Sequence, residues 1–176
     1  MSASASSPSA ALPIARVLLR ILIAVNWLWG VAILILLFAV PHREWIMSAL
    51  DLAASPDTDR VVMGLRATVV LGLAVIPLNY VFLTRLLAIV ETVRDGDPFV
   101  AANARRLQTM AWALLGLQLL GFVIGAIIKS ISTPAHPINV DTGGSINGWL
   151  AVLLTFLLAR VFAEGAHMRE DLEGTV

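Results

Sequence analysis

Four long runs of apolar residues alternate with shorter polar segments along the chain. Each run provides enough residues for an α-helix to cross the hydrocarbon core of a membrane, which takes roughly 20. The second run is longer than that, so its end is expected to leave the membrane as an amphipathic extension through Glu91 and Thr92. The pattern predicts an all-α integral membrane protein, a four-transmembrane-helix bundle with spans at about 17–40, 61–90, 107–128 and 148–163.

The segments outside these runs differ in composition. Residues 1–15 are rich in Ser, Ala and Pro without apolar periodicity, so a disordered tail is expected. In residues 41–60 the apolar positions share one helical face with Trp45, which indicates an interfacial helix or, alternatively, a lid over an external cavity. Residues 129–147 are expected to be an exposed loop. The chain is thus divided into the tail, one membrane domain over residues 16–172 and a short C-terminal tail over residues 173–176.

The polar segment between the second and third runs, residues 91–106, is predicted to be a hinge. Gly96 suits the left-handed position that follows the end of a helix. Asp97 suits the N-cap of the next helix, and Pro98 fits its first turn, where no backbone donor is missed. We therefore expect a tight turn that ends one membrane helix and begins the next.

Composition supports this class and removes several functions. Hydrophobic residues make up 59% of the chain and mean hydropathy is +0.87. Charged residues make up 14%, against roughly 25% in an ordinary soluble domain. The formal net charge is zero, so no basic field favours direct binding of nucleic acid. The absence of cysteine excludes disulfides, thiolate nucleophiles and cysteine-ligated metal sites.

Basic residues are distributed unequally between the two sides of the predicted membrane domain. Eight lie beside the termini and the hinge: Arg16, Arg20, Arg85, Arg94, Arg105, Arg106, Arg160 and Arg169. Four lie on the other side: Arg43, Arg60, Arg66 and Lys129. Short cytoplasmic loops of membrane proteins carry an excess of basic residues. We therefore expect the hinge and both termini in the cytoplasm, N-in and C-in.

Three amide side chains interrupt the apolar spans, namely Asn26, Asn79 and Gln118. An amide at that depth needs a hydrogen-bond partner, so Asn26 and Gln118 are expected to join neighbouring helices. Pro77 implies a kink in the second span, and the neighbouring Asn79 could satisfy the freed carbonyls. The alternative is a transport site around this kink, which predicts that at least two of the three amides share one cavity.

The third span contains a G-x-x-x-G pattern at Gly121 and Gly125. Small residues at this spacing let two helix backbones approach closely, so we expect helix packing here rather than ligand binding. His136 in the following loop has no second histidine or carboxylate at ligand spacing, which gives little reason to expect a metal.

Motifs for catalysis and cofactor binding are absent from the sequence. It contains no phosphate-binding loop, no H-E-x-x-H motif and no G-x-S-x-G motif. The centres of the four predicted spans carry no carboxylate, which a proton relay or an intramembrane aspartyl protease would need. We therefore predict no catalytic residue, no cofactor and no metal ligand, and an enzyme acting on lipid is the least favoured reading.

The hinge and the tail resemble a known family. In the hinge, the motif is Gly-Asp-Pro-Phe at residues 96–99, followed by Asn103 and Leu107. In the tail, the motifs are residues 157–166 and 169–176. These motifs are similar to those of the domain of unknown function 2975, a bacterial four-span membrane family, over about residues 61–176. The resemblance implies location in the bacterial cytoplasmic (inner) membrane. Members are often encoded beside a small helix-turn-helix regulator, which implies a regulatory partnership.

Two functions from different classes follow from these observations. The first is a regulatory or interaction protein that presents a cytoplasmic docking surface to a soluble partner, such as a small DNA-binding regulator. The second is a small transporter or channel subunit with its polar site around the kinked second span. In either case the bilayer is a partner, and a homo-oligomer stays open. The predicted docking surface consists of Arg94, Asp97, Phe99, Asn103, Arg105, Arg106, Glu164, Arg169 and Glu170.

Overall fold

The computed structural model describes residues 11–39, 56–132 and 145–173. Within them the chain is helical apart from residues 95–100, Ser132 and Ser145. The helices are α1 (Ala11–Ala39), α3 (Pro56–Arg94), α4 (Ala101–Ile131) and α5 (Ile146–Glu173). All four are long and apolar enough to cross a membrane. The predicted all-α membrane fold with four spanning helices is therefore confirmed.

The helices extend beyond the predicted spans at most of their ends. α1 begins at Ala11, so residues 11–15 are helical and the predicted disordered tail was drawn too long. α5 continues through Glu173, well beyond Arg160. Residues of opposite charge lie at helical spacing in this last part of the chain, which favours a helix there. Most of the predicted interfacial segment, most of the loop around His136 and residues 174–176 lie outside the described residues.

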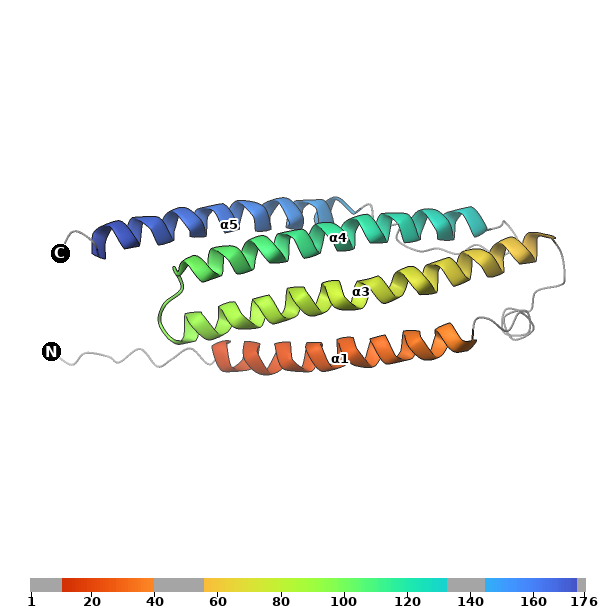
Figure 1. Cartoon of the computed structure of the whole chain (residues 1–176), viewed down its shortest axis with the longest axis horizontal. Coiled ribbons are helices and arrows are strands. Elements are labelled where there is room, and N and C mark those ends of the chain that lie inside the picture. Colours follow the sequence, from red (N-terminus) through yellow and green to blue (C-terminus); the bar gives the residue numbers. More distant parts are fainter. Residues whose placement is uncertain (1–10, 40–55, 133–144, 174–176) are drawn as a thin grey trace.

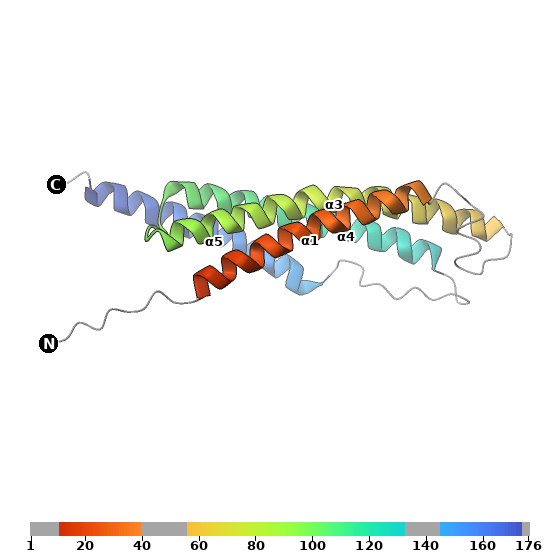
Figure 2. The ribbon, with the colours of Figure 1, turned by 90° about the horizontal axis from the view of Figure 1, so that it is seen from below.

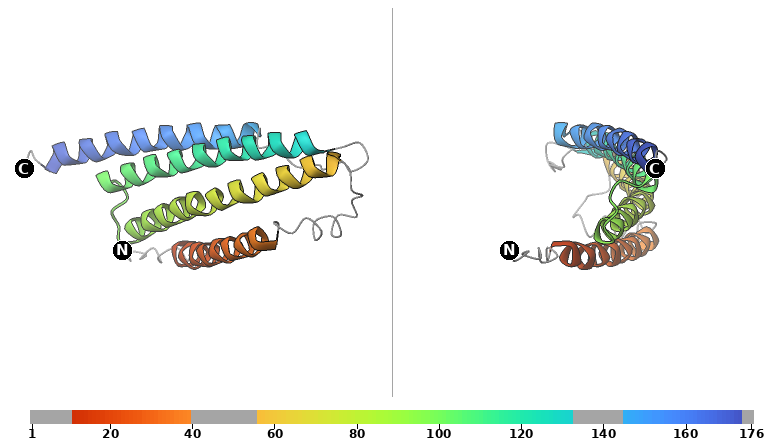
Figure 3. Two further views of the ribbon diagram at one scale, coloured as in Figure 1. Left: turned by 45° about the vertical axis from the view of Figure 1, so that its right-hand side comes forward. Right: turned by 90° about the vertical axis from the view of Figure 1, so that its left-hand side faces the viewer.

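The four helices form one curved row. α1 packs on α3, α3 on α4, and α4 on α5, and the end-on view in Figure 3 shows the resulting crescent. α1 crosses α3 obliquely, whereas α3, α4 and α5 run more nearly alongside one another (Figure 2). The sequence predicted the helices, but this order follows only from the packing.

Side chains are buried along the seams of this row. One cluster joins α3, α4 and α5 and has Leu107, Met110 and Ala159 at its centre. Another joins α1 to α3 around Val62 and Val69. Large apolar side chains such as Trp29, Phe38 and Leu153 are exposed on the outer faces. A membrane explains this distribution, because lipid covers such faces without the cost that water would impose.

The start of α1, the turn at residues 95–100 and the end of α5 lie at the same end of the molecule, which we call the hinge end (Figure 1). α5 projects past the turn and past the start of α4 (Figures 1 and 3). This arrangement agrees with termini on one side of the membrane. That this side is the cytoplasm stays a prediction from the basic residues.

Charged residues indicate how deep the hinge end lies. On α3, Arg66 and Arg85 border a stretch without charges. Residues 67–84 cover about 27 Å at roughly 1.5 Å per residue, close to the roughly 30 Å of a hydrocarbon core. On α4, the uncharged stretch begins after Arg106. We therefore place the boundary of the hydrocarbon near Arg85 and Arg106, with the turn and the end of α5 beyond it.

Candidate functional site

The turn at the hinge end closes α3 with a specific hydrogen-bond pattern. The amide of Gly96 donates to the carbonyl of Val93 (3.2 Å), and that of Asp97 donates to the carbonyl of Thr92 (3.1 Å). This pair of bonds is the Schellman motif, which requires a left-handed residue after the helix. Gly96 has φ +89°, so its predicted role is confirmed.

The start of α4 differs from the prediction. The helix begins at Ala101, and its N-cap is Val100, which has an extended backbone (φ −101°, ψ 143°) and no side-chain cap. Asp97 is therefore not the N-cap, and Pro98 lies before the helix rather than in its first turn. The Asp97 carboxylate pairs with Arg169 of α5 instead of capping the helix.

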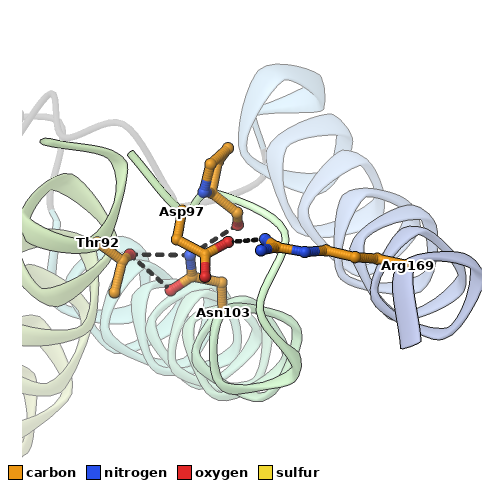
Figure 4. Close-up of polar contacts among 5 residues, drawn as sticks. Thr92, Asp97, Asn103 and Arg169 are labelled. Atoms are coloured by element: carbon orange, nitrogen blue, oxygen red, sulfur yellow. Dashed lines mark hydrogen bonds and ion pairs between the residues drawn. The ribbon is translucent and has the colours of Figure 1, made fainter. Parts of the chain in front are cut away.

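Asn103 is the fully buried centre of the hinge end, with 0% of its surface exposed. Its amide nitrogen donates to the hydroxyl of Thr92 and to the carbonyl of Pro98, each at 2.8 Å. Figure 4 shows both bonds, which connect the first turn of α4 to the end of α3 and to the turn itself. A buried amide is costly unless it is bonded, and here both of its hydrogens are used.

Arg106 completes this network. One of its guanidinium nitrogens donates to Asn103 Oδ1 at 2.8 Å and lies 3.2 Å from the carbonyl oxygen of Ala88 on α3. The charged donor strengthens the bond to the amide oxygen. Asn103 and Arg106, both predicted as docking residues, thus fasten α4 to α3.

α5 is attached to the turn by two further contacts. Asp97 and Arg169 form an ion pair (Figure 4). The ring of Phe99 stacks on that of Phe162, with centroids 5.2 Å apart. A Cβ atom on Gly165 would lie 3.2 Å from Phe99 Cδ1, so the absence of a side chain there lets the ring approach the helix. On the other edge of the row, Arg16 of α1 pairs with Glu91 of α3 at 3.3 Å.

The structure brings the predicted docking residues to one end, but most of them contact the protein itself. Arg94 lies 3.7 Å from its neighbour Asp95, and Glu164 pairs with Arg160 at 3.1 Å. The Arg105 side chain is exposed and pairs with no carboxylate among the described residues. Glu170 lies on α5, within its last turns. Fewer residues are therefore available to contact a partner than the nine that were predicted.

A groove of about 440 Å³ lies between the start of α4 and the second half of α5. Its rim carries four polar side chains: Arg105, Gln108, Arg160 and His167. Its floor is made by small residues, Ala101, Ala104, Ala159, Ala163 and Ala166, together with Phe156. Sequence reasoning missed Gln108, Arg160 and His167 as site residues. The matching alanine spacings on the two segments were the available signal, but they gain meaning only once α4 and α5 are known to be neighbours.

A second hollow, of about 250 Å³, opens between α3 and α4. It is lined by Arg85, Ala102, Arg105, Arg106 and Thr109. Three guanidinium groups therefore border one small space. Arg105 belongs to both sites, Arg85 borders only the hollow, and His167 borders only the groove.

The intramembrane amides lie at different helix contacts. Asn26 is buried, and its side-chain nitrogen on α1 donates to the carbonyl of Ile76 on α3 at 3.2 Å. Asn26 thus bonds the carbonyl of the residue before Pro77. Asn79, which was expected to satisfy the carbonyls freed by the proline, is half-buried. Gln118 on α4 lies against Gly148 of α5, where an added Cβ would be 2.3 Å from its side-chain oxygen.

These positions bear on the transport alternative, which required shared polar space. Asn26 serves the α1–α3 contact and Gln118 the α4–α5 contact, at opposite edges of the row. The hollow beside Pro77 is apolar and is lined mainly by Trp27, Leu73 and Tyr80 with their aliphatic neighbours, without any of the three amides. Of the two glycines in the predicted packing pattern, Gly125 is buried and Gly121 half-buried.

Among the described residues, no group of three or more His, Asp or Glu side chains is placed to hold a metal ion. The polar side chains that line the groove and the hollow at the hinge end are instead arginine, glutamine, histidine and threonine. Such side chains bind carboxylates and phosphates, so the arrangement is suited to recognise anions.

The chain matches one family model over nearly its whole length. The model, described as "Protein of unknown function (DUF2975)", covers residues 5–176. The match confirms the resemblance carried by the hinge and the tail, and it extends that resemblance from residues 61–176 to the first helix as well. Searches of the curated proteins and of the solved structures found no match.

Proposed function

Since the chain belongs to the domain of unknown function 2975 family, a family without an assigned activity, we propose a function from its own geometry: a multi-pass regulatory or interaction protein. In this proposal its hinge end docks a soluble partner on the cytoplasmic side of the bacterial inner membrane. The single observation that carries the proposal is the braced hinge end, where polar contacts hold three helix ends together outside the hydrocarbon.

The bracing supports a docking role because it keeps a surface in one shape. Asn103 is bonded to both sides of the turn, and Asp97 ties the turn to α5. A surface that is rigid before binding loses less conformational entropy when a partner arrives. Flexible loops would solvate the membrane edge equally well, so the buried network supports a function beyond solvation.

The groove between α4 and α5 is the part of this end that is open to a partner. Its floor of alanines allows close approach of another backbone, and Phe156 adds apolar surface. Arg105 on its rim favours an acidic partner segment, because complementary charge steers association and selects among partners. An amphipathic helix with acidic flanks fits this description. The family resemblance favours a helix-turn-helix regulator as the protein that carries it.

The test is affinity purification of the tagged full-length protein after crosslinking in intact cells, followed by mass spectrometry. The variant combines Gln108→Glu with His167→Glu, which adds two negative charges to the groove and leaves Asn103 and Arg106 untouched. Lys129→Glu is the matched control, because it makes the same change of charge at an exposed position at the opposite end of α4. We expect a small DNA-binding protein to co-purify with the wild type and the control, and to be lost with the groove variant.

Two results would count against the proposal. If the same protein co-purifies equally with the groove variant at equal expression, the groove is not its binding surface. If no soluble protein is enriched over a membrane-protein control, even after crosslinking, the docking function loses its basis.

A further inference from the structure

Arginines at the hinge end divide into two groups by their partners. Four are paired with carboxylates: Arg16 with Glu91, Arg94 with Asp95, Arg160 with Glu164, and Arg169 with Asp97. In the part of the chain that the structure describes, no carboxylate pairs with Arg20, Arg85, Arg105 or Arg106. Three of these four, Arg85, Arg105 and Arg106, line the hollow between α3 and α4.

Positive charge in this hollow is therefore not compensated by the protein. Arg106 is held by two neutral acceptors, Asn103 Oδ1 and the Ala88 carbonyl, which fix its position without cancelling its charge. Like charges gathered in one place repel one another, and a bound anion relieves the repulsion. Arg85 and Arg105 are both exposed and reach the same space from different helices.

The hollow has the chemistry and the size for a phosphate group. Guanidinium groups bind phosphate oxygens through paired N–H donors. Thr109 also borders the hollow, but its hydroxyl donates to the Arg105 carbonyl at 2.9 Å, so the donors to a phosphate are the guanidinium groups. The volume of about 250 Å³ is several times the roughly 30 Å³ that a water molecule occupies in the liquid.

The depth of the hollow in the membrane decides whether a phospholipid phosphate or a free phosphate would bind there. Arg85 and Arg106 mark the ends of the uncharged stretches of α3 and α4 on the hinge side. A group between them lies at the level of the lipid phosphates, with lipid tails alongside the exposed apolar faces of the helices. A free phosphate in solution would lack the second, apolar contact that a phospholipid makes.

We propose that the hollow between α3 and α4 is a binding site for the phosphate headgroup of one anionic phospholipid. Arg85 and Arg105 bind the phosphate oxygens from the two helices, and Arg106 provides a fixed positive charge behind them. A lipid bound at this site would connect α3 to α4 at the level where the uncharged stretches of the two helices end. It is separate from the proposed partner groove, and the two share only Arg105.

Native mass spectrometry of the full chain in detergent tests this site. The probes are phosphatidylglycerol, phosphatidylcholine and inorganic phosphate, each titrated alone. We expect one phosphatidylglycerol per chain to bind in preference to phosphatidylcholine. Arg85→Ala should weaken phosphatidylglycerol binding by about fivefold or more, because one basic residue near the membrane surface typically contributes that much. Arg60→Ala, an exposed arginine near the other end of α3, is the matched control and should bind as the wild type does.

Arg85→Lys is a second variant that keeps the charge and loses the paired donors. It should fall between the wild type and Arg85→Ala if the guanidinium geometry matters. Equal binding of phosphatidylglycerol by Arg85→Ala and Arg60→Ala would overturn the proposal, as would equal binding of phosphatidylcholine. Binding of inorganic phosphate as tight as that of the lipid would overturn the assignment to a lipid. Partner capture by Arg85→Ala should be unchanged, so failure of this site and failure of the groove can be distinguished.

Discussion

The hinge end and the middle of the α1–α3 contact each contain one buried asparagine, and the two side chains are held in different ways. Asn103 donates two hydrogen bonds, accepts one from a guanidinium group, and connects α3, the turn and α4. Asn26 makes one hydrogen bond among the described residues, to the Ile76 carbonyl, and it connects α1 to α3. Exposure is 0% at Asn103 and 7% at Asn26, so burial alone does not separate them.

The difference shows in which region this protein relies on polar contacts. Beyond the hydrocarbon, water competes for every exposed donor, and a buried network excludes it and fixes one arrangement of the chain. Within the hydrocarbon, helices associate through close packing of small residues, and a single amide adds a modest bond. We therefore expect the hinge end to be fixed by polar contacts and the span contacts to be fixed mainly by shape.

The largest effect is expected from Asn103→Leu. This change removes the buried amide that bonds the Pro98 carbonyl and the Thr92 hydroxyl, and it leaves Arg106 with the Ala88 carbonyl as its one remaining acceptor among the described residues. A buried polar group that loses its partner is costly. We expect a loss of about 3 kcal/mol in the free energy of unfolding. The measurement is unfolding of the purified protein by SDS titration in mixed micelles. Asn79→Leu, at a half-buried position on α3, is the control and should cost far less.

A loss below about 1 kcal/mol for Asn103→Leu would contradict the comparison, because one well-made hydrogen bond is typically worth that much. It would mean that the turn is held mainly by its backbone, through the Schellman bonds around Gly96. Asn103→Asp refines the result, since it keeps the acceptor for Arg106 and removes the donor to Pro98.

Shape at the span contacts is tested by two glycines of α3. A Cβ on Gly64 would lie 2.5 Å from Ile131 Cγ2 of α4, whereas a Cβ on Gly72 would lie 3.8 Å from Ile33 Cδ1 of α1. Overpacking typically costs about 1–3 kcal/mol, offset in part by the higher helix propensity of alanine. We expect Gly64→Ala to lose about 1.5 kcal/mol in the same titration and Gly72→Ala to be neutral or stabilising.

Equal effects of these two alanine substitutions would show that close approach does not hold the α3–α4 contact. The hinge end would then be the main source of specificity in that pair of helices. The contrast between Gly64 and Gly72 is useful because both lie on one helix and receive the same side chain.

A smaller effect is expected from Asn26→Leu. Hydrogen bonds between membrane helices contribute about 0.6 kcal/mol on average and at most about 1.7 kcal/mol. We expect a loss of about 1 kcal/mol, lower than that of Asn103→Leu by a factor of about three. A double-mutant cycle with Pro77→Ala measures whether the amide responds to the irregular backbone beside Pro77. Additive losses in this cycle would show that Asn26 acts independently of the proline.

The sequence predicts much of this fold for a clear physical reason. A span must satisfy its backbone internally and face lipid, so long apolar runs identify helices with little ambiguity. Gly96 was predicted for a similarly local reason, because its left-handed conformation depends on the turn alone. The order of the helices in a row could not be predicted, since an apolar face that meets lipid and one that meets another helix have similar compositions.

Individual site residues were harder to predict because their partners lie far away in the sequence. Asp97 was expected at the N-cap, yet its carboxylate contacts Arg169, which is 72 residues further along the chain. Asn103 was expected to face a partner, and the structure instead buries it. Arg106 is half-buried, bonds Asn103 and borders the hollow between α3 and α4. Arg160 was expected near the membrane boundary, but its place on a groove depends on the contact between α4 and α5.

The smallest effect is expected from the ion pair between Asp97 and Arg169. Both side chains are close to half exposed, at 43% and 47%, and exposed pairs typically contribute less than about 1 kcal/mol. Asp97→Asn, Arg169→Gln and the double variant form a cycle whose coupling energy should fall below that value and shrink as salt is raised. The Phe99–Phe162 contact should keep α5 on the turn in all three variants. A coupling energy as large as the loss in Asn103→Leu would mean that the Asp97–Arg169 ion pair stabilises the protein as much as the buried Asn103 network does. The exposed rim of the hinge end, rather than its buried centre, would then hold α5 in place.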